Sequence, residues 1–173
     1  IASVDGDELL CLIYSAVNGY IYLGGNNARI QVWDMTSSEY VGNMMGHDDA
    51  VTCLTLDQNY LFSGSDDKTI RVWETVNNLP IYVLNGHTSS IRDVMIIPVS
   101  GSLVSCAHDG LICIWRYQSQ EIIKQIDRSD ELNCLAFISS INVILAGTES
   151  HAIITIPIEP EYGNPNGEDN TVD

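Results

Sequence analysis

Apolar and polar positions alternate along this chain in short runs, and turn residues separate the runs. Residues 50–56, AVTCLTL, are apolar and rich in β-branched side chains, and residues 57–59, DQN, form a turn signal. The runs YLFSG (60–64), TIRVW (69–73) and IYVL (81–84) follow, each separated by Asp, Asn, Ser or Pro. A period of two residues is typical of strands, and no segment shows a helical period. The pattern predicts four short strands in each stretch of about forty residues.

The strand pattern recurs at a nearly constant spacing. Trp33, Trp73 and Trp115 stand 40 and 42 residues apart, and the pairs Gly46-His47 and Gly86-His87 stand 40 residues apart. The segments around the tryptophans align as NNARIQVWD, DDKTIRVWE and HDGLICIWR. A fourth segment, ESHAIITIP, places Ile156 at the tryptophan position. A period of this length indicates stacked units of supersecondary structure.

Residues 159–173 differ in composition from the repeated units. They are rich in Pro, Gly, Asn and acidic residues and offer little apolar surface to bury. A segment of this kind does not form a core of its own. We therefore expect a repeat domain over residues 1–158, with units at about 1–42, 43–84, 85–125 and 126–158. An acidic disordered tail or linker is expected over 159–173.

The repeat resembles that of a known family. Gly-His, a strand, and then SGSDDKTIRVWE over Ser63 to Glu74 is similar to the WD-repeat β-propellers, and the likeness covers about residues 1–158. Members of this family fold as rings of four-stranded blades. The resemblance implies an all-β chain with about four blades of four antiparallel strands. WD-repeat rings are mostly seven-bladed, so it also implies a part of a larger ring, completed by blades from the rest of the parent chain.

The resemblance gives a structural role to polar residues that look catalytic. In the family, His, Ser or Thr, Asp and Trp of one repeat form a hydrogen-bonded relay inside the blade. Carried over, the relay residues are His47, Ser63, Asp67 and Trp73 in the second unit and His87, Ser105, Asp109 and Trp115 in the third. Such a relay leaves few buried polar atoms without a partner, each of which would cost on the order of 1–3 kcal/mol. The alternative, a Ser-His-Asp catalytic triad, requires a serine that is open to substrate.

The first and fourth units depart from this pattern. Asn27 and Leu23 stand at the aspartate and serine positions of the first unit, and Val4-Asp5 lies near its Gly-His position. Asp127-Arg128, Ala146, Ser150 and Ile156 replace the set in the fourth unit. We therefore expect both of these blades to be held by apolar packing alone and to be less rigid.

Charged residues gather in the turns that the resemblance places on one face of the ring. In the family, that face commonly receives peptides or partner domains. The candidate partner-binding residues are Asp48, Asp49, Asp66, Lys68, Asp130, Glu131 and Glu149. Arg128 joins Lys68 as the basic minority on this face. An acidic rim of this kind favours a basic protein partner, although charged loops also serve solubility.

Composition narrows the classes of partner. The chain has 7 Lys and Arg against 23 Asp and Glu, a formal net charge of −16. Nucleic-acid affinity rests mostly on Lys and Arg contacts to phosphates, so nucleic acid and anionic membranes are not expected as partners. The five cysteines include no C-x-x-C pair, which predicts reduced thiols in the cytoplasm, without disulfides, metal ions or other cofactors.

These observations favour a non-catalytic protein–protein interaction scaffold, acting as a structural or adaptor subunit of a larger assembly. The alternative is a substrate-recognition subunit of a multi-protein enzyme such as a ubiquitin ligase. That role calls for a basic cluster able to receive acidic or phosphorylated segments. The stretch GHTSSIRDVMIIPVSGSLVSCAHDGLICIWRY also resembles the large WD-repeat proteins of cilia and flagella, which implies an axonemal role.

Overall fold

The computed structural model describes residues 8–98 and 100–158, and fifteen β-strands account for their regular structure. The all-β prediction is confirmed, and the strands form four antiparallel sheets. The first two sheets contain β1 (Leu9–Tyr14), β2 (Tyr20–Gly25), β3 (Arg29–Asp34), β4 (Glu39–Met45), β5 (Val51–Asp57), β6 (Tyr60–Ser65), β7 (Ile70–Glu74) and β8 (Leu79–Leu84). The other two contain β9 (Ile91–Ile97), β10 (Ser102–Ala107), β11 (Leu111–Arg116), β12 (Glu121–Asp127), β13 (Leu132–Ile138), β14 (Val143–Thr148) and β15 (Ile153–Pro157).

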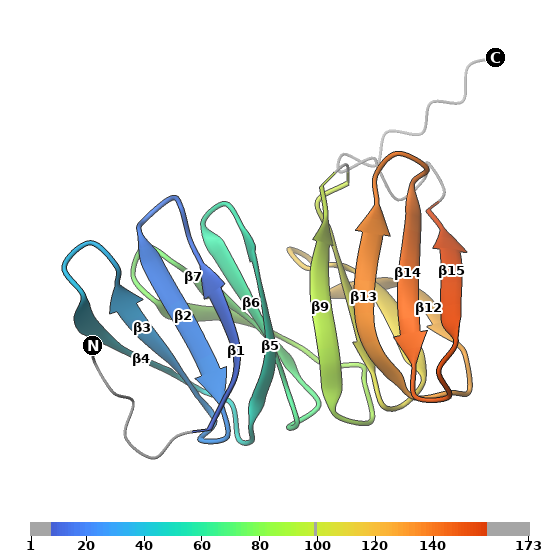
Figure 1. The fold of residues 1–173 in the computed structure, drawn as a ribbon, viewed down its shortest axis with the longest axis horizontal. Helices are drawn as coiled ribbons and strands as arrows, with labels where there is room; N and C mark the ends of the chain where they lie inside the picture. Colours follow the sequence, from blue (N-terminus) through green and yellow to red (C-terminus); the bar gives the residue numbers. More distant parts are fainter. Residues whose placement is uncertain (1–7, 99, 159–173) are drawn as a thin grey trace.

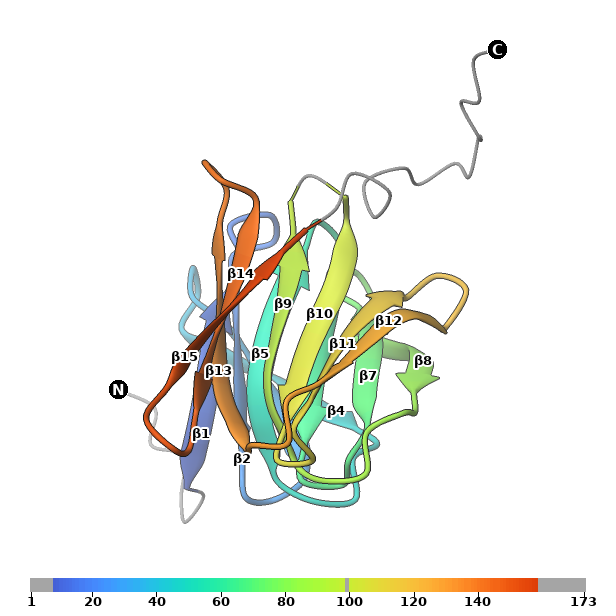
Figure 2. The same ribbon diagram turned by 90° about the vertical axis from the view of Figure 1, so that its right-hand side faces the viewer.

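Each sheet follows the order of the chain, from an inner strand to an outer one (Figures 1 and 2). The first three sheets have four strands, and the fourth has three in the part of the chain that the structure describes. The inner strands β1, β5, β9 and β13 contact one another in sequence. Consecutive blades of a propeller are arranged in this way. The expected tail over 159–173 and the pair Val4-Asp5 lie outside the described residues.

One turn position shows how regularly the units repeat. The residue that ends the turn before the third strand has a positive φ in every sheet: Ala28 (57°), Lys68 (73°), Gly110 (78°) and His151 (67°). Glycine adopts this left-handed conformation at little cost, but three of the four units use another residue. The residue types at this position differ, but the backbone has the same left-handed conformation in all four units.

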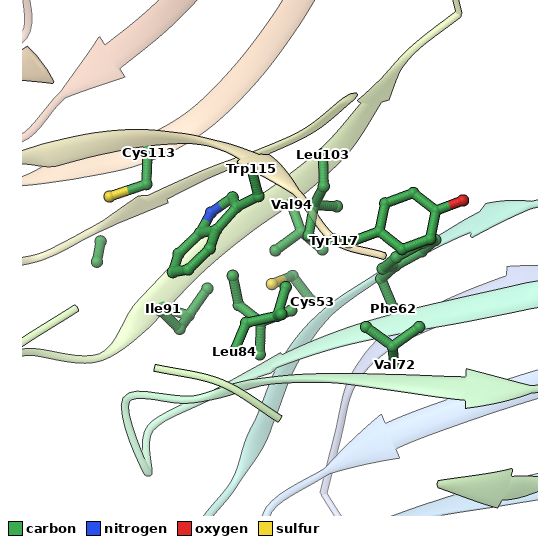
Figure 3. Close-up of a cluster of buried hydrophobic side chains, with 12 residues drawn as sticks. Cys53, Phe62, Val72, Leu84, Ile91, Val94, Leu103, Cys113, Trp115 and Tyr117 are labelled. Atoms are coloured by element: carbon green, nitrogen blue, oxygen red, sulfur yellow. The ribbon is translucent and has the colours of Figure 1, made fainter. Parts of the chain in front are cut away.

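The core lies between sheets, where the face of one sheet packs on the next. Trp73, fully buried in β7, packs with Tyr22, Ile30 and Val32 of the first sheet. Trp115 of β11 packs in the same way between the second and third sheets, in a cluster that includes Phe62 (Figure 3). A third cluster fills the junction between the third and fourth sheets. Each junction thus buries an apolar side from two units, so neighbouring units depend on each other for stability.

The two end sheets present apolar faces to solvent. In β1, Cys11 and Ile13 pack toward the second sheet, while Leu12 and Tyr14 point the other way and are 65% and 56% exposed. In β15, Ile154 and Ile156 pack toward the third sheet, whereas Ile153 is 75% exposed. Alternate side chains of a strand lie on opposite faces, so these residues mark the outer faces of the row of sheets.

Side-chain hydrogen bonds also cross each junction near the inner strands. The Cys11 thiol donates to the carbonyl oxygen of Val51 at 3.5 Å, and the Thr52 hydroxyl donates to that of Ile91 at 2.6 Å. At the third junction the side chain is the acceptor and the backbone is the donor. Asp93 Oδ2 accepts the backbone N–H of Leu135 at 2.7 Å. Burial raises the pKa of Asp93, since it disfavours the charged form. Asp93 stands at the position that a cysteine occupies in the other three units, but the sequence pattern does not identify the Leu135 amide as its partner.

The described part of the chain contains no helix that is long and apolar enough to cross a membrane.

Candidate functional site

Four polar groups form a continuous chain inside the second sheet. The Trp73 indole N–H donates to Ser63 Oγ at 2.8 Å. Ser63 Oγ lies 2.7 Å from His47 Nε2, and His47 Nδ1 lies 2.6 Å from Asp67 Oδ2. When the ring proton of His47 is on Nδ1, Nδ1–H donates to the carboxylate and the serine hydroxyl donates to Nε2, so the four groups satisfy one another.

The third sheet repeats this arrangement with little change. The Trp115 indole N–H donates to Ser105 Oγ at 2.8 Å, and Ser105 Oγ lies 2.8 Å from His87 Nε2. His87 Nδ1 lies 3.0 Å from Asp109 Oδ2. The histidine and tryptophan ring centroids are 6.2 Å apart in both sheets. We call these two chains the second and third relays.

Each relay also fastens a loop to a turn. Asp67 accepts the backbone N–H groups of Asp48 at 3.1 Å and Thr69 at 2.8 Å. Asp109 accepts those of Thr88 at 2.7 Å and Leu111 at 3.0 Å. In both cases one carboxylate holds the loop before the inner strand and the turn before the third strand. The aspartate is therefore the point at which the relay reaches the loop surface.

The Gly-His pairs have a steric reason. A Cβ added to Gly46 would lie 2.9 Å from Arg71 Nη1 and 3.1 Å from Trp73 Cη2. A Cβ added to Gly86 would lie 2.6 Å from Ile122 Cδ1 and 2.9 Å from Trp115 Cη2. The relay tryptophan thus lies against the glycine that precedes the relay histidine. A larger residue would displace the ring and with it the first donor of the relay.

The burial of the serines decides between a relay and a catalytic triad. Ser63 and Ser105 are fully buried, and each hydroxyl oxygen already accepts an indole N–H. A nucleophilic serine needs access to a substrate carbon, which these side chains lack. The geometry supports an internal structural role for both sets.

Replacing Ser63 with alanine is expected to lower the free energy of unfolding by about 2–4 kcal/mol. The change leaves the Trp73 N–H and His47 Nε2 buried without a partner, at a cost of about 1–3 kcal/mol each. Urea denaturation at neutral pH measures the difference. Ser105→Ala is expected to have an equal effect, and the exposed Ser119→Ala a negligible one. A loss below about 1 kcal/mol in Ser63→Ala would contradict the relay's role in stability.

Acid is expected to destabilise the fold in two phases. Burial lowers the pKa of His87, although the neighbouring Asp109 carboxylate acts in the opposite direction. Burial would raise the pKa values of Asp67 and Asp109, but hydrogen bonds, including those from His47 and His87, bring both below their ordinary value. The folded state thus holds fewer protons than the unfolded state in each case.

The resulting loss of stability begins below about pH 6.5, where the unfolded histidine takes up a proton. It steepens below about pH 4, as the pH falls from the unfolded aspartate pKa toward the lower folded one. Urea midpoints measured from pH 8 to pH 3 would show both phases. A midpoint that stays constant from pH 7 to pH 5 would contradict the histidine contribution.

The expectation that apolar packing alone holds the first and fourth sheets was wrong, whereas their lower rigidity stays a prediction. The Trp33 indole N–H donates to Gln31 Oε1 at 3.3 Å, and the Asn18 amide donates to the Tyr22 hydroxyl at 2.9 Å. In the fourth sheet, the hydroxyl oxygen of the buried Thr148 accepts the backbone N–H of Ala152 at 3.1 Å. Buried or half-buried polar groups need partners wherever they lie, so these sheets satisfy them with other residues. Nothing in the sequence pattern marks Gln31 or Asn18 as partners.

The predicted partner-binding residues lie in loops and turns at one end of the sheets. The β6–β7 turn is tied to the preceding loop by the bond from Asp66 N to Ala50 O, 2.9 Å long. The β14–β15 turn is tied in the same way by the bond from Glu149 N to Glu131 O, 2.8 Å long. We call this surface the loop face. It comprises Asp48, Asp49, Asp66, Lys68, Asp130, Glu131 and Glu149.

Some of these residues make bonds within the protein that sequence reasoning missed. Asp66 accepts the hydroxyl of Ser90, which lies in the loop before the third sheet. Asp130 accepts the Ser150 hydroxyl, and the Asn133 amide donates to Glu149 at 2.8 Å. Asp48 and Glu131 are exposed and carry no side-chain hydrogen bond among those described, although Glu131 lies 3.9 Å from His108 Nδ1. These two acids are therefore the most available to a partner.

A small open cavity lies on the loop face between the third and fourth sheets. Its volume is about 150 Å³. It is lined by His108, Asp109, Gly110, Ser129, Asp130 and Glu131. Within the described residues, no group of three or more His, Cys, Asp or Glu side chains is arranged to hold a metal ion. The five cysteines are unpaired, and burial raises the pKa of the Cys11 thiol to about 12, which keeps it protonated at neutral pH.

Comparison with known proteins agrees with this geometry. The family model described as "WD domain, G-beta repeat" matches residues 38–74 and 78–116. Each matched segment contains one complete relay. These two segments of the chain are therefore similar to WD40 repeats. The matched segments run from β4 to β7 and from β8 to β11, so they cover most of the second and third sheets, the two in which histidine, serine, aspartate and tryptophan are all present.

Two curated relatives are similar over most of the chain. Human "Protein NEDD1" is 27% identical over 127 residues, which are 71% of this chain and 19% of the relative. "Anaphase-promoting complex subunit cdc20" of Dictyostelium discoideum is 29% identical over 115 residues, which are 66% of this chain and 23% of the relative. The matched region thus spans about a fifth of the length of each relative.

Proposed function

We propose that this chain is part of a non-catalytic protein-interaction scaffold whose loop face receives a basic partner protein. The proposal rests on where the polar residues lie: one set is inside the sheets and the other is on the loop face. The second and third relays use their histidines, serines and aspartates inside the sheets. Acidic side chains such as Asp48 and Glu131 remain exposed on the loop face.

Charge favours a basic partner over an acidic one. The chain has a formal net charge of −16, and the loop face sets six acidic residues against Lys68 and the neighbouring Arg128. Such a field steers a positively charged partner toward the face and repels an acidic one. A substrate-recognition subunit for acidic or phosphorylated segments would need the opposite charge, so that role is the less favoured alternative.

The relatives support a role as a subunit without naming a partner for this chain. One relative is by name a subunit of the anaphase-promoting complex. Neither printed name refers to a cilium, so the proposal does not include an axonemal role, which rests on the sequence resemblance alone.

Binding of fluorescent peptides of matched length tests the proposal. One peptide is rich in Lys and Arg, and the other is rich in Asp and Glu. We expect the basic peptide to bind at low salt, to weaken as the salt concentration rises, and to lose affinity in the double variant Asp48→Lys, Glu131→Lys. The control variant Glu39→Lys, Glu121→Lys changes the charge by the same amount on outer strands and is expected to retain binding. Equal affinity in both variants would refute the loop face as the site.

A further inference from the structure

The turns at the end of the sheets opposite the loop face differ from it in charge. In the first two sheets these turns are residues 15–19 (SAVNG), 35–38 (MTSS), 58–59 (QN) and 75–78 (TVNN), and none of these residues is charged. They lie at the upper end of the sheets in Figure 1. The loop face, by contrast, carries six acidic residues. We call this uncharged end the turn face.

Two valines are exposed at the tips of these turns. Val17 is 71% exposed and Val76 is 70% exposed, and neither belongs to one of the three core clusters of the described residues. The exposure of Val76 does not come from an uncovered sheet, because the second sheet packs against the first on one side and the third on the other. Exposed loops of a soluble protein are usually polar, so the two valines are apolar surface that the fold itself does not use.

A hydrogen bond between the first two sheets holds the two valines near each other. The Asn18 side-chain amide donates to the carbonyl oxygen of Thr75 at 3.4 Å. Asn18 directly follows Val17, and Thr75 directly precedes Val76. The two exposed side chains therefore stand on either side of one bond between turns of neighbouring sheets.

The same turn is fastened to a third one. Thr75 is buried, and both its backbone N–H and its hydroxyl donate to the carbonyl oxygen of Asn59, at 2.9 Å and 3.0 Å. Tyr60 follows Asn59, is 36% exposed and has its ring centroid 6.0 Å from that of Tyr117 in the third sheet. Exposed apolar side chains thus come from three turns that hydrogen bonds tie together. We call them the valine patch, which comprises Val17, Tyr60 and Val76.

The charged residues that border the valine patch are acidic. In the first two sheets, the strand ends next to these turns carry Asp34, Glu39, Asp57 and Glu74. The basic residues of the same sheets lie near the loop face or at the start of the third strands, and they are Arg29, Lys68 and Arg71. An apolar patch with an acidic edge is complementary to apolar side chains that are flanked by Lys or Arg.

We infer that the valine patch docks an amphipathic segment of a partner protein, in which apolar side chains lie between Lys or Arg residues. The apolar side chains cover Val17 and Val76, and the basic ends of the segment lie near acids such as Glu74. The inference goes beyond the proposed function, because it concerns the opposite end of the sheets. Binding there depends mainly on apolar burial, so it is less sensitive to salt than binding at the loop face.

Selection from a phage-displayed library of random peptides tests the inference. The library is selected on the parent protein and, separately, on the double variant Val17→Ser, Val76→Ser. Peptides enriched only on the parent are expected to carry apolar residues between Lys or Arg. Measured by fluorescence anisotropy, such a peptide is expected to lose affinity by roughly tenfold or more in the double variant, as for central contacts of an interface.

Two further variants serve as controls. Ile141→Ser, Ile153→Ser removes two apolar side chains that are 65% and 75% exposed on the fourth sheet, and it is expected to retain the affinity. Asp48→Lys, Glu131→Lys alters the loop face and is also expected to retain it. Circular dichroism confirms that each variant is folded.

Three results would overturn the inference. The first is a selection that enriches no peptide, or the same peptides on the parent and on Val17→Ser, Val76→Ser. The second is an affinity that falls in Asp48→Lys, Glu131→Lys instead, which would place the binding on the loop face. The third is a dimer in sedimentation velocity that Val17→Ser, Val76→Ser dissociates, which would show that a second copy covers the patch.

Discussion

Replacing Trp73 with alanine is expected to lower the free energy of unfolding by about 3–5 kcal/mol, the usual range for a buried tryptophan. Trp73 is fully buried and packs with Tyr22, Ile30 and Val32 across the first junction. Its indole N–H is also the first donor of the second relay. The substitution therefore removes apolar contacts between two sheets and leaves the Ser63 hydroxyl without its donor. Urea denaturation followed by circular dichroism measures the change.

Trp33 offers a matched control at the same position of the first sheet. It is only half-buried, no sheet covers its face among the described residues, and its indole donates to Gln31 at 3.3 Å. Trp33→Ala is therefore expected to cost about 1–2 kcal/mol, mainly through the lost contact with Tyr40, whose ring centroid lies 5.2 Å away. Equal losses in the two variants would mean that tertiary burial and the relay contribute little beyond the position of the residue in the strand.

Replacing Gly64 with valine is expected to lower the free energy of unfolding by about 1–3 kcal/mol or more. The new side chain would enter the space of Ile91 Cγ2 and Cys53 Sγ, each 2.5 Å from the first added atom. Neither side chain can move aside easily, because both are packed in the cluster between the second and third sheets. Thermal unfolding of the 173-residue chain compares the variant with the parent sequence.

Gly147 provides the control for that substitution. An added Cβ there would meet only the exposed Cys134 sulfur among neighbours within 4 Å, and this side chain is free to move. Gly147→Val is therefore expected to change the stability of the 173-residue chain by less than about 0.5 kcal/mol. A large loss at Gly147, or a small one at Gly64, would show that the space beside these glycines does not govern the packing of one sheet on the next.

Several features of the fold could be predicted from local patterns. Strand alternation and the spacing of Trp33, Trp73 and Trp115 were enough to expect four all-β units. Alignment on the tryptophans also assigned Leu23 and Ala146 to the position that Ser63 has in the second unit. The strand pairing in the structure gives the same equivalence. These features follow from the period of the chain, because a strand's register is set by its own pattern and by the turn that precedes it.

Other features joined residues that no local pattern connects. The hydroxyl of Ser90 donates to Asp66, 24 residues away along the chain. The backbone amide of Leu135 donates to Asp93, 42 residues away. The expectation that the first and fourth sheets use apolar packing alone failed for the same reason. That expectation rested only on the relay residues that these sheets lack. Buried polar groups form hydrogen bonds with any suitable partner that the packing places near them.

The sequence by itself determined the number of repeating units and their strands, because alternation and spacing are properties of the chain before it folds. The relay residues followed from the resemblance to WD-repeat proteins. Only the tertiary structure decided how the units meet: which glycines leave room for a side chain of the next sheet, which backbone amide Asp93 accepts, and which acids on the loop face make no hydrogen bond among those described. Those outcomes depend on sheet-to-sheet packing, where contacts form between residues about forty positions apart and close packing leaves little room for alternatives.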